Sequence, residues 1–368
     1  MNYEVYNCSD WKMPVGRGKD ERNFIKEVTN IVEILLNSDQ PGGIFFWVQL
    51  LAQALVTGSK NYARTEGLHK MVETKMLNRF FSSQILSYLS DHALDLLPKL
   101  PDLEMFPGKA WGIKLEFSLR KPCLSKDDTE FYILDNPVRK EWVFKVPYIA
   151  PSQWKGALRA AMVQELKRWW ESFSNDEKAA HLEEFAERRF RMTLLFGDEK
   201  GEEPGSLKGL AKYLDDLGGE EAANLYREKV KKFFKTKAES LLPHHRGWLY
   251  FYPTYFDRIG LEVINPHSRE TGAGERPIHF ESVPADTKGR FVLLYVPLGE
   301  VGEAEMREDF RAVAQGLKAM FTRYGFGAKT SSGFGRANVH WKKEEGAEIR
   351  PEDLSEEWEK VWKDDPNG

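Results

Sequence analysis

A glycine-rich segment from Tyr324 to Arg336 has the composition of a phosphate-binding loop. It contains four glycines, three consecutive hydroxyl side chains and two cations. Glycine lets backbone N–H groups approach a ligand closely and adopt positive φ angles, and successive N–H groups in such a turn can bind an anion. The segment follows an expected helix and no Gly-Lys-Ser/Thr opens a helix after it, which excludes a dinucleotide fingerprint and a Walker loop. A plain glycine-rich turn is the alternative. We predict phosphate contacts from Gly325, Gly327, Lys329, Thr330, Ser331, Ser332, Gly333, Gly335 and Arg336.

A second candidate surface is the stretch from residue 136 to residue 160, which holds five basic residues and one acid. Lys155 and Arg159 lie four residues apart on an expected helix, so their side chains share a face near its amino-terminal end, where unpaired N–H groups also attract phosphate. Tyr148 and Trp154 provide rings that stack on bases. A solvated helix start is the alternative. The predicted nucleic-acid contacts of this stretch are Arg139, Lys140, Lys155 and Arg159.

Asp135 lies in a loop beside this basic stretch. Asp-Asn-Pro is good turn chemistry, which is the simpler interpretation. A carboxylate there could also hold a divalent ion, or orient the attacking oxygen during phosphodiester cleavage. Asp135 is therefore the candidate catalytic residue and the candidate ligand of a divalent metal, expected to be Mg²⁺.

Three loop histidines, His244, His245 and His267, offer a different chemistry. Imidazoles titrate near neutral pH, so they could act as general acid and base in RNA cleavage without a metal. The eight histidines and two cysteines do not have the spacing of a metal site.

Composition limits the function classes. The sequence has 368 residues, of which 41% are hydrophobic and 30% charged, as in a packed globular protein. The net charge of −4 gives no overall basic field, so any nucleic-acid contact needs a local patch. The most apolar run, Gly42 to Val56, is shorter than the roughly 20 residues of a membrane span. We expect a cytoplasmic protein with no membrane partner.

The hydrophobic pattern changes near residue 107. Apolar residues recur at helical spacing from about residue 21 to residue 97, whereas residues 111–119 alternate as in a half-buried strand. Further strands are expected at 247–252, 290–296 and 337–341, and helices at 151–170, with Ser152 as N-cap, and at 303–323. The order strand, helix, strand, strand, helix, strand predicts an α+β, ferredoxin-like domain.

The expected organisation has three parts. A helical amino-terminal region spans residues 1–107, and a ferredoxin-like domain spans residues 108–343, with a charged helical insertion at about 198–243. The stretch 344–368 holds ten acidic and three basic residues, which predicts a solvated acidic tail.

The segments Asp135-Asn-Pro-Val-Arg and Pro147-Tyr-Ile-Ala-Pro-Ser-Gln-Trp-Lys-Gly-Ala-Leu-Arg159 resemble the signature Asp-Ser-Pro-Val … Pro-Gly-Ser-Ser-Leu-Lys-Gly-x-x-Arg of the RAMP superfamily. Leu195-Phe-Gly197, Arg246-Gly-Trp-Leu-Tyr-Phe251 and the glycine-rich segment follow in that superfamily's order. The similarity is nearest to RNA-binding backbone subunits of type III CRISPR effector complexes, and in part to Cmr-type end-capping subunits. Ala150-Pro151, Gln153-Trp154 and Asn136 depart from the signature.

The resemblance implies a modified RNA-recognition fold that grips guide RNA by its phosphates inside an antiviral CRISPR ribonucleoprotein, next to target RNA and other subunits. It also implies target-RNA cleavage by an aspartate after the first strand with a divalent metal, and Asp135 fits that loop best. Two alternatives remain open. One is a metal-independent endoribonuclease that processes guide RNA with the loop histidines, and the other is a non-catalytic capping or scaffold subunit.

Overall fold

The computed structural model describes residues 97–106, 108–125, 136–141, 146–199, 209–235, 244–265 and 278–363. The expected helices between residues 21 and 97 lie outside these ranges, as do Asp135 and His267. The chain divides into two units, and each is described by itself. The larger unit comprises residues 96–123, 148–256 and 285–368, and the described part of the other comes from 124–147 and 257–284.

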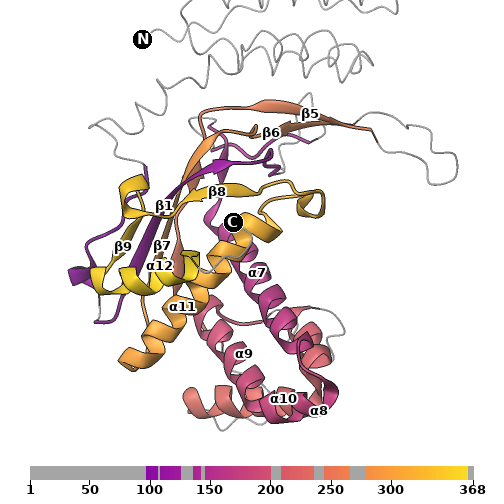
Figure 1. The fold of residues 1–368 in the computed structure, drawn as a ribbon, viewed down its shortest axis with the longest axis vertical. Coiled ribbons are helices and arrows are strands. Elements are labelled where there is room, and N and C mark those ends of the chain that lie inside the picture. Colours follow the sequence, from indigo (N-terminus) through magenta and orange to yellow (C-terminus); the bar gives the residue numbers. More distant parts are fainter. Residues whose placement is uncertain are drawn as a thin grey trace, which may run out of the picture. The chain divides into compact units, whose positions relative to one another are not determined.

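The larger unit is built on an antiparallel sheet (Figure 1). Its central strand β1 (Trp111–Leu119) pairs along its length with β7 (Lys288–Tyr295), whose other side pairs with β3 (Leu249–Phe251). On its second side β1 pairs with β8 (Ala337–His340), so the strand order is β3-β7-β1-β8. All four strands overlap the ranges expected from the sequence. A short ladder in the same unit joins β2 (Tyr148–Ile149) to β4 (Thr254–Tyr255).

Two long helices pack against each other and cover one face of the sheet. They are α7 (Pro151–Glu171) and α11 (Glu303–Ala319), which continues into a π-helical turn at Met320–Tyr324. The expectation that Ser152 caps α7 is wrong. Proline at the first helical position suits its fixed φ, so Ala150 becomes the N-cap and its N–H donates to the Gln153 side chain at 3.0 Å.

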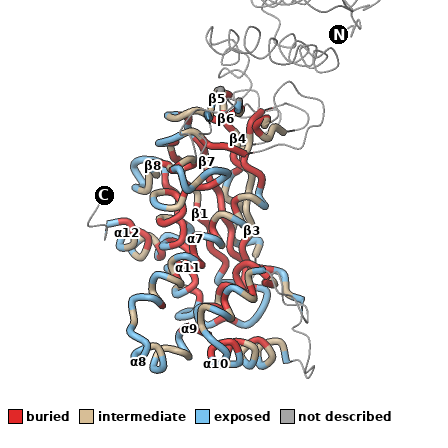
Figure 2. Tube along the Cα trace, turned by 90° about the vertical axis from the view of Figure 1, so that its right-hand side faces the viewer, coloured by how far each residue is buried: buried red, intermediate tan, exposed pale blue. Residues whose placement is uncertain are grey.

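Aromatic rings form the core between the sheet and these helices. The Trp154 ring centroid lies 5.0 Å from that of Phe291, and Phe117 and Phe321 complete the cluster. Figure 2 shows buried residues running along β1, β7 and α7. The first turn of α7 is therefore fixed in the core, and this position determines where the next residues of that helix point.

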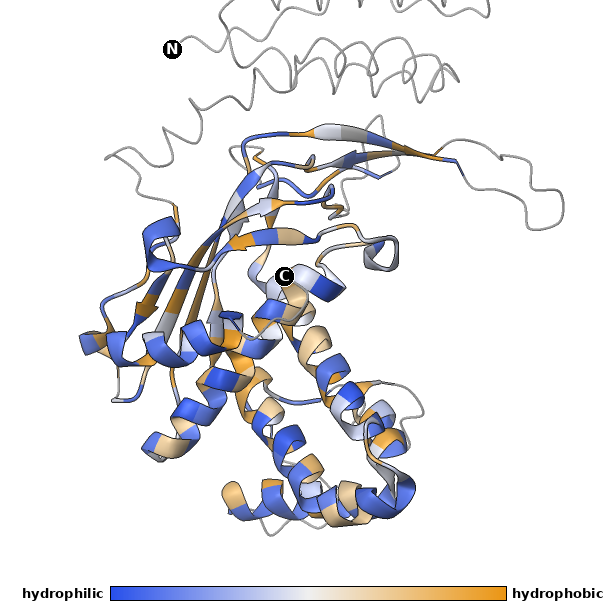
Figure 3. Ribbon diagram, viewed as in Figure 1, coloured by the Kyte–Doolittle hydropathy of each residue, from blue (hydrophilic) through white to orange (hydrophobic). Residues whose placement is uncertain are grey.

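A helical insertion follows α7. It contains α8 (Asn175–Lys178), a 3₁₀ turn at Ala179–His181, α9 (Leu182–Phe196) and α10 (Leu210–Phe233). Figure 3 shows hydrophilic residues over the outer sides of α9 and α10 and hydrophobic residues along the sheet. The insertion was expected from about residue 198. Its helices begin at residue 175, because α9 carries the apolar positions that pack on α10 and α7.

The predicted solvated tail is instead folded as far as residue 363. The strand β9 (Glu348–Arg350) pairs with β1 beyond the end of β8, and α12 (Ser355–Lys363) packs on α11. The acidic composition did not indicate a packed helix, because the acidic residues occupy the outer side of α12. Trp358 and Trp362, four residues apart on its other side, are buried.

Short elements complete the larger unit. The 3₁₀ turn η3 (Leu103–Met105) precedes β1, η6 (Thr330–Ser332) lies in the glycine-rich segment, and η7 (Lys343–Glu345) and η8 (Glu352–Leu354) flank β9. The other unit contains the antiparallel pair β5 (Gly260–Ile264) and β6 (Ile278–Ser282). Helices and antiparallel sheets together confirm the α+β class. Among the helices in the described ranges, none combines the length and the apolar character needed to cross a bilayer.

Candidate phosphate-binding site

The site begins with the first two turns of α7. Trp154 and Leu158 point into the core and are fully buried, so the neighbouring residues Lys155 and Arg159 lie half-buried at the side of the helix. The two cations are close enough that the charge of Arg159 lowers the pKa of Lys155, as their spacing of four residues predicts.

A close crossing of two loops brings further charges to this helix. Gly197, at the end of α9, forms a bridge with Arg246, and the N–H of Asp198 donates to the His245 carbonyl at 3.3 Å. Gly197 has a φ of 82°, and a Cβ there would lie 2.7 Å from the His245 carbonyl oxygen. A Cβ on Gly247 would lie 2.4 Å from the Phe196 carbonyl carbon, so the crossing requires both glycines.

The crossing creates a group of three cations, Lys155, Arg159 and Arg246, which we call the basic cluster. Burial lowers the pKa of Lys155, and repulsion from Arg159 and Arg246 lowers it further, whereas Asp198 opposes the shift. Burial also lowers the pKa of Arg159, with Glu199 opposing. For both side chains burial is the largest cause, and for Lys155 repulsion from the neighbouring cations adds to it. A bound anion would relieve that repulsion.

Both nearby carboxylates are held by other partners. Asp198 accepts from the His245 N–H at 2.5 Å and pairs with Nδ1 of His244 at 2.8 Å. Glu199 is buried and receives two hydrogen bonds from Arg189, of 3.0 and 2.7 Å. Each carboxylate therefore acts both on the basic cluster and on a partner outside it.

The glycine-rich segment folds into a closed loop. The Phe326 N–H donates to the Gly335 carbonyl at 3.1 Å and closes it. Gly325, Gly327, Gly333 and Gly335 all have positive φ, as the composition predicts. At Gly335 a Cβ would lie only 1.8 Å from the Phe326 carbonyl oxygen, so no other residue fits there. This backbone explains the glycines structurally, and the phosphate contacts of the loop stay a prediction.

The loop presents its polar residues outward. Lys329, Ser331 and Ser332 are exposed and Thr330 is half-buried. Nε of Arg336 is buried and has no hydrogen-bond partner within the described part of the chain. The loop base contacts α7 directly, because the ring centroids of Phe326 and Trp154 lie 4.6 Å apart. This contact holds the glycine-rich loop against the start of α7, because Trp154 directly precedes Lys155 in that helix.

The structure removes Lys140 from the predicted set. In the smaller unit its ammonium lies 2.5 Å from a Glu281 carboxylate oxygen, and the two side chains are 7% and 1% exposed. Glu281 also accepts from the Val138 N–H at 3.1 Å, so this ion pair is a buried structural contact rather than an RNA-binding group. Arg139 is half-buried, and its RNA contact stays a prediction.

Sequence reasoning missed Asp198, Glu199 and Arg246. Their signal was the pair of glycines at 197 and 247, which indicate a close approach of two backbones. Of the histidines, His244 is exposed and oriented by Asp198, while His245 is half-buried and contacts the Leu194 carbonyl through Nε2 at 3.2 Å.

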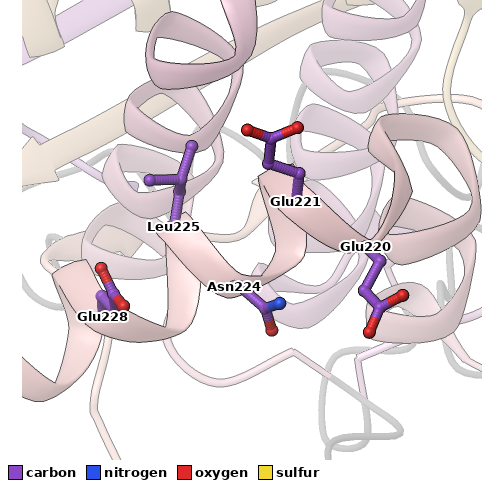
Figure 4. Close-up of a pocket in the computed structure, with 5 residues that line it drawn as sticks. All are labelled: Glu220, Glu221, Asn224, Leu225 and Glu228. Atoms are coloured by element: carbon purple, nitrogen blue, oxygen red, sulfur yellow. The ribbon is translucent and has the colours of Figure 1, made fainter.

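A cavity on α10 differs from this site in charge. It is lined by Glu220, Glu221, Asn224, Leu225 and Glu228, and Figure 4 shows the three glutamate carboxylates projecting from the helix. Such a surface repels phosphate.

In the described ranges, no three histidine, cysteine or acidic residues group as a metal site, and Asp135 lies outside those ranges.

The fold is that of an α+β protein, and three cations group at the start of α7. The sequence matches the family model of the RAMP superfamily over residues 105–338, and the chain belongs to that superfamily. The resemblance seen in the sequence motifs is thereby confirmed at the level of the superfamily.

Two solved structures are similar to this chain. A cryo-EM structure of the type III-B Cmr-beta complex bound to cognate target RNA contains a chain with 12% identity and a TM-score of 0.41, over 89% of this chain and 98% of that one. The crystal structure of Cmr6 from Pyrococcus furiosus has 18% identity and a TM-score of 0.30, over 62% of this chain and 97% of that one. No protein of curated function matches the sequence.

Proposed function

We propose that this chain is an RNA-binding subunit of a type III CRISPR ribonucleoprotein effector complex, acting in antiviral defence with guide RNA, target RNA and other subunits as partners. Superfamily membership supports the class of protein. The observation that carries the RNA-binding role is that Lys155 lies close enough to Arg159 and Arg246 for their charges to lower its pKa. Phosphodiester groups are the anions that such a cluster on an RNA-associated protein would meet.

We also infer a ferredoxin-like arrangement for the larger unit. Taken in chain order without β9, the four strands β1, β3, β7 and β8 lie in the spatial order second, third, first, fourth. The helix α7, followed by the helical insertion, lies between the first and second strands, and α11 lies between the third and fourth. This order supports the inference, because it matches an antiparallel sheet formed by two interleaved strand–helix–strand units.

In this proposal the RNA backbone lies across the start of α7. Lys155 and Arg159 bind phosphate oxygens, with Arg246 supplying the third charge, and the exposed polar residues of the glycine-rich loop extend the contact. Binding through phosphates is independent of base sequence and depends strongly on salt. Such a surface suits a subunit that must hold guides of any sequence.

Charge reversal tests the proposal. The double variant Lys155→Glu/Arg159→Glu is expected to weaken binding of single-stranded RNA more than about tenfold at low salt, measured by fluorescence anisotropy. The matched control is Lys167→Glu/Arg168→Glu, which makes the same charge change on a distant turn of the same helix. Equal affinity of the cluster variant and the control would remove the basic cluster from RNA binding.

Target-RNA cleavage through Asp135 with a divalent metal, expected to be Mg²⁺, is a further part of the proposal. We expect Asp135→Ala to abolish cleavage by the assembled complex and to leave RNA binding intact. A carboxylate at that position would hold the ion or orient the attacking oxygen. Unchanged cleavage by the alanine variant would make this chain a non-catalytic scaffold.

One observation favours a second candidate, metal-independent RNA cleavage. Asp198 pairs with Nδ1 of the exposed His244 imidazole at 2.8 Å. The charge of Asp198 also opposes the lowering of the Lys155 pKa, so this carboxylate–imidazole pair lies beside the basic cluster. In that reaction His244 removes the proton of the ribose 2′-OH, the 2′-oxygen attacks phosphorus to form a 2′,3′-cyclic phosphate, and the 5′-oxygen leaves with a proton taken from water. Cleavage that persists in EDTA and is lost in His244→Gln identifies this route, whereas loss in EDTA identifies the metal route.

A further inference from the structure

We propose that the larger unit binds a positively charged polypeptide segment, in extended conformation, along the edge of its sheet at β9. This surface lies on elements that the phosphate-binding proposal does not use. We call it the β9 groove. It has a volume of about 600 Å³ and is lined by residues of η3, β9, η8 and α12.

The backbone of β9 is the first observation. β1 pairs with β7 on one side and with β8 and then β9 on the other, so β9 forms part of the sheet edge. Within the described residues, β1 is the strand that pairs with β9, and all three residues of β9 line the groove. Unpaired strand edges accept an added strand through main-chain hydrogen bonds.

The apolar floor is the second observation. Ile349, opposite Ile113 in the register, is 8% exposed, and it lines the groove together with Trp358 of α12. Leu103 and Trp341 are half-buried and Pro351 is exposed, so apolar surface remains open to a partner. Apolar side chains on one face of an added strand would be buried here.

The charge of the rim identifies the occupant. Five acidic and two basic residues line the groove: Asp102, Glu104, Glu348, Glu352 and Glu359, with Lys343 and Arg350. The formal rim charge is therefore −3, which repels RNA and attracts lysine and arginine side chains.

A cation of the partner can replace a cation of this chain in the ion pairs already present on the rim. Lys343 and Glu352 are 3.0 Å apart, but their side chains are 79% and 82% exposed, and such surface pairs contribute little stability. Glu348 also pairs with Lys114 at 2.6 Å and with Arg350 at 2.5 Å, and the half-exposed Glu359 pairs with Lys363 at 2.5 Å. A partner cation can take over a solvated carboxylate at small cost, so the groove favours a segment that alternates basic and apolar residues.

A synthetic peptide tests this inference. The probe is a fluorescein-labelled, seven-residue peptide of alternating lysine and valine, titrated against the full-length protein by anisotropy at low salt. We expect saturable binding that weakens about tenfold in Glu352→Lys/Glu359→Lys. The matched control, Glu220→Lys/Glu228→Lys, makes the same charge change on the α10 cavity and is expected to bind like the wild type. Equal weakening in both variants would overturn the proposal, because it indicates unspecific attraction.

A second measurement reports the binding mode and does not depend on the variants. Amide hydrogen exchange of residues 348–350 is expected to slow when the lysine–valine peptide is bound and to stay unchanged with a glutamate–valine peptide. Unchanged exchange with the basic peptide would contradict strand addition at β9. Displacement of the peptide by single-stranded RNA in the Lys155→Glu/Arg159→Glu background would also overturn the proposal, because the groove would then bind nucleic acid.

Discussion

At the scale of single residues, the basic cluster combines positions that the sequence predicts and positions that it does not. Lys155 and Arg159 are predictable, because four residues on a helix return to the same face. Arg246 and Asp198 are not, because they reach α7 only through the crossing of two loops at Gly197. The sequence predicts that Lys140 belongs to the same charged surface. In the structure it forms a buried ion pair with Glu281 of β6 instead. Charge counting along a chain does not reveal such partners.

His245 gives a prediction on pH. Burial lowers its pKa, the charge of Lys155 lowers it further, and the Leu194 carbonyl and Asp198 oppose the shift. The folded protein therefore binds this proton more weakly than the unfolded chain, whose histidine titrates near 6.5. The stabilising contribution is complete above that pH and is lost as the pH falls below it. Urea denaturation between pH 5 and 8 is expected to show this loss, and His245→Gln to reduce it. An identical pH dependence in the variant would exclude His245 as its source.

At the scale of elements, a buried arginine joins the helices of the insertion. Arg189 of α9 is 1% exposed, forms two hydrogen bonds with Glu199, and pairs with Asp215 of α10 at 2.6 Å. Its guanidinium also lies 4.0 Å from the ring centroid of Tyr226. The helical pattern of the sequence predicts that helices form here, but the contacts of Arg189 that join α9 to α10 depend on tertiary geometry.

We expect Arg189→Leu to lower the free energy of unfolding by about 3–5 kcal/mol, because it leaves the Glu199 carboxylate buried without its partner. The double variant Arg189→Leu/Glu199→Leu is expected to be less destabilised than the single one, since no buried charge remains unpaired there. Denaturation by guanidinium chloride measures both. A double variant less stable than the single one would contradict this account of the pair.

The carboxyl-terminal elements show a different limit of sequence reasoning. Acidic composition indicated a solvated tail, and the decisive signal was the spacing of Trp358 and Trp362, which places both on one face of α12. Trp358 is 2% exposed and its Nε1 donates to the Trp341 carbonyl at 2.8 Å.

Truncation of Trp358 distinguishes a folded terminus from a solvated tail. We expect Trp358→Ala to lower the free energy of unfolding by about 3–5 kcal/mol through loss of buried ring surface. Glu356→Ala, on the exposed side of the same helix, is expected to leave it nearly unchanged. Thermal unfolding followed by circular dichroism checks both, and a wild-type melting temperature for Trp358→Ala would contradict the packing of α12.

At the scale of the whole molecule, the net charge of −4 conceals a separation of charge. The basic cluster on α7, the acidic cavity on α10 and the acidic rim of the β9 groove lie in the same unit of the chain. Strand and helix order were predictable because strands of period two and helices of period 3.6 leave distinct patterns. The separation of charge was not, because it depends on which residues the fold brings together.

The central claim is that phosphate groups bind to Lys155 and Arg159, and the salt dependence of RNA binding tests it most directly. Each phosphate contact on single-stranded RNA contributes about −0.7 to the slope of log K against log salt concentration. The slope of the Lys155→Glu/Arg159→Glu variant is therefore expected to be shallower than that of the wild type by about 1.4, with the Lys167→Glu/Arg168→Glu control unchanged. A cluster variant with the slope of the wild type would show that RNA binds this protein elsewhere.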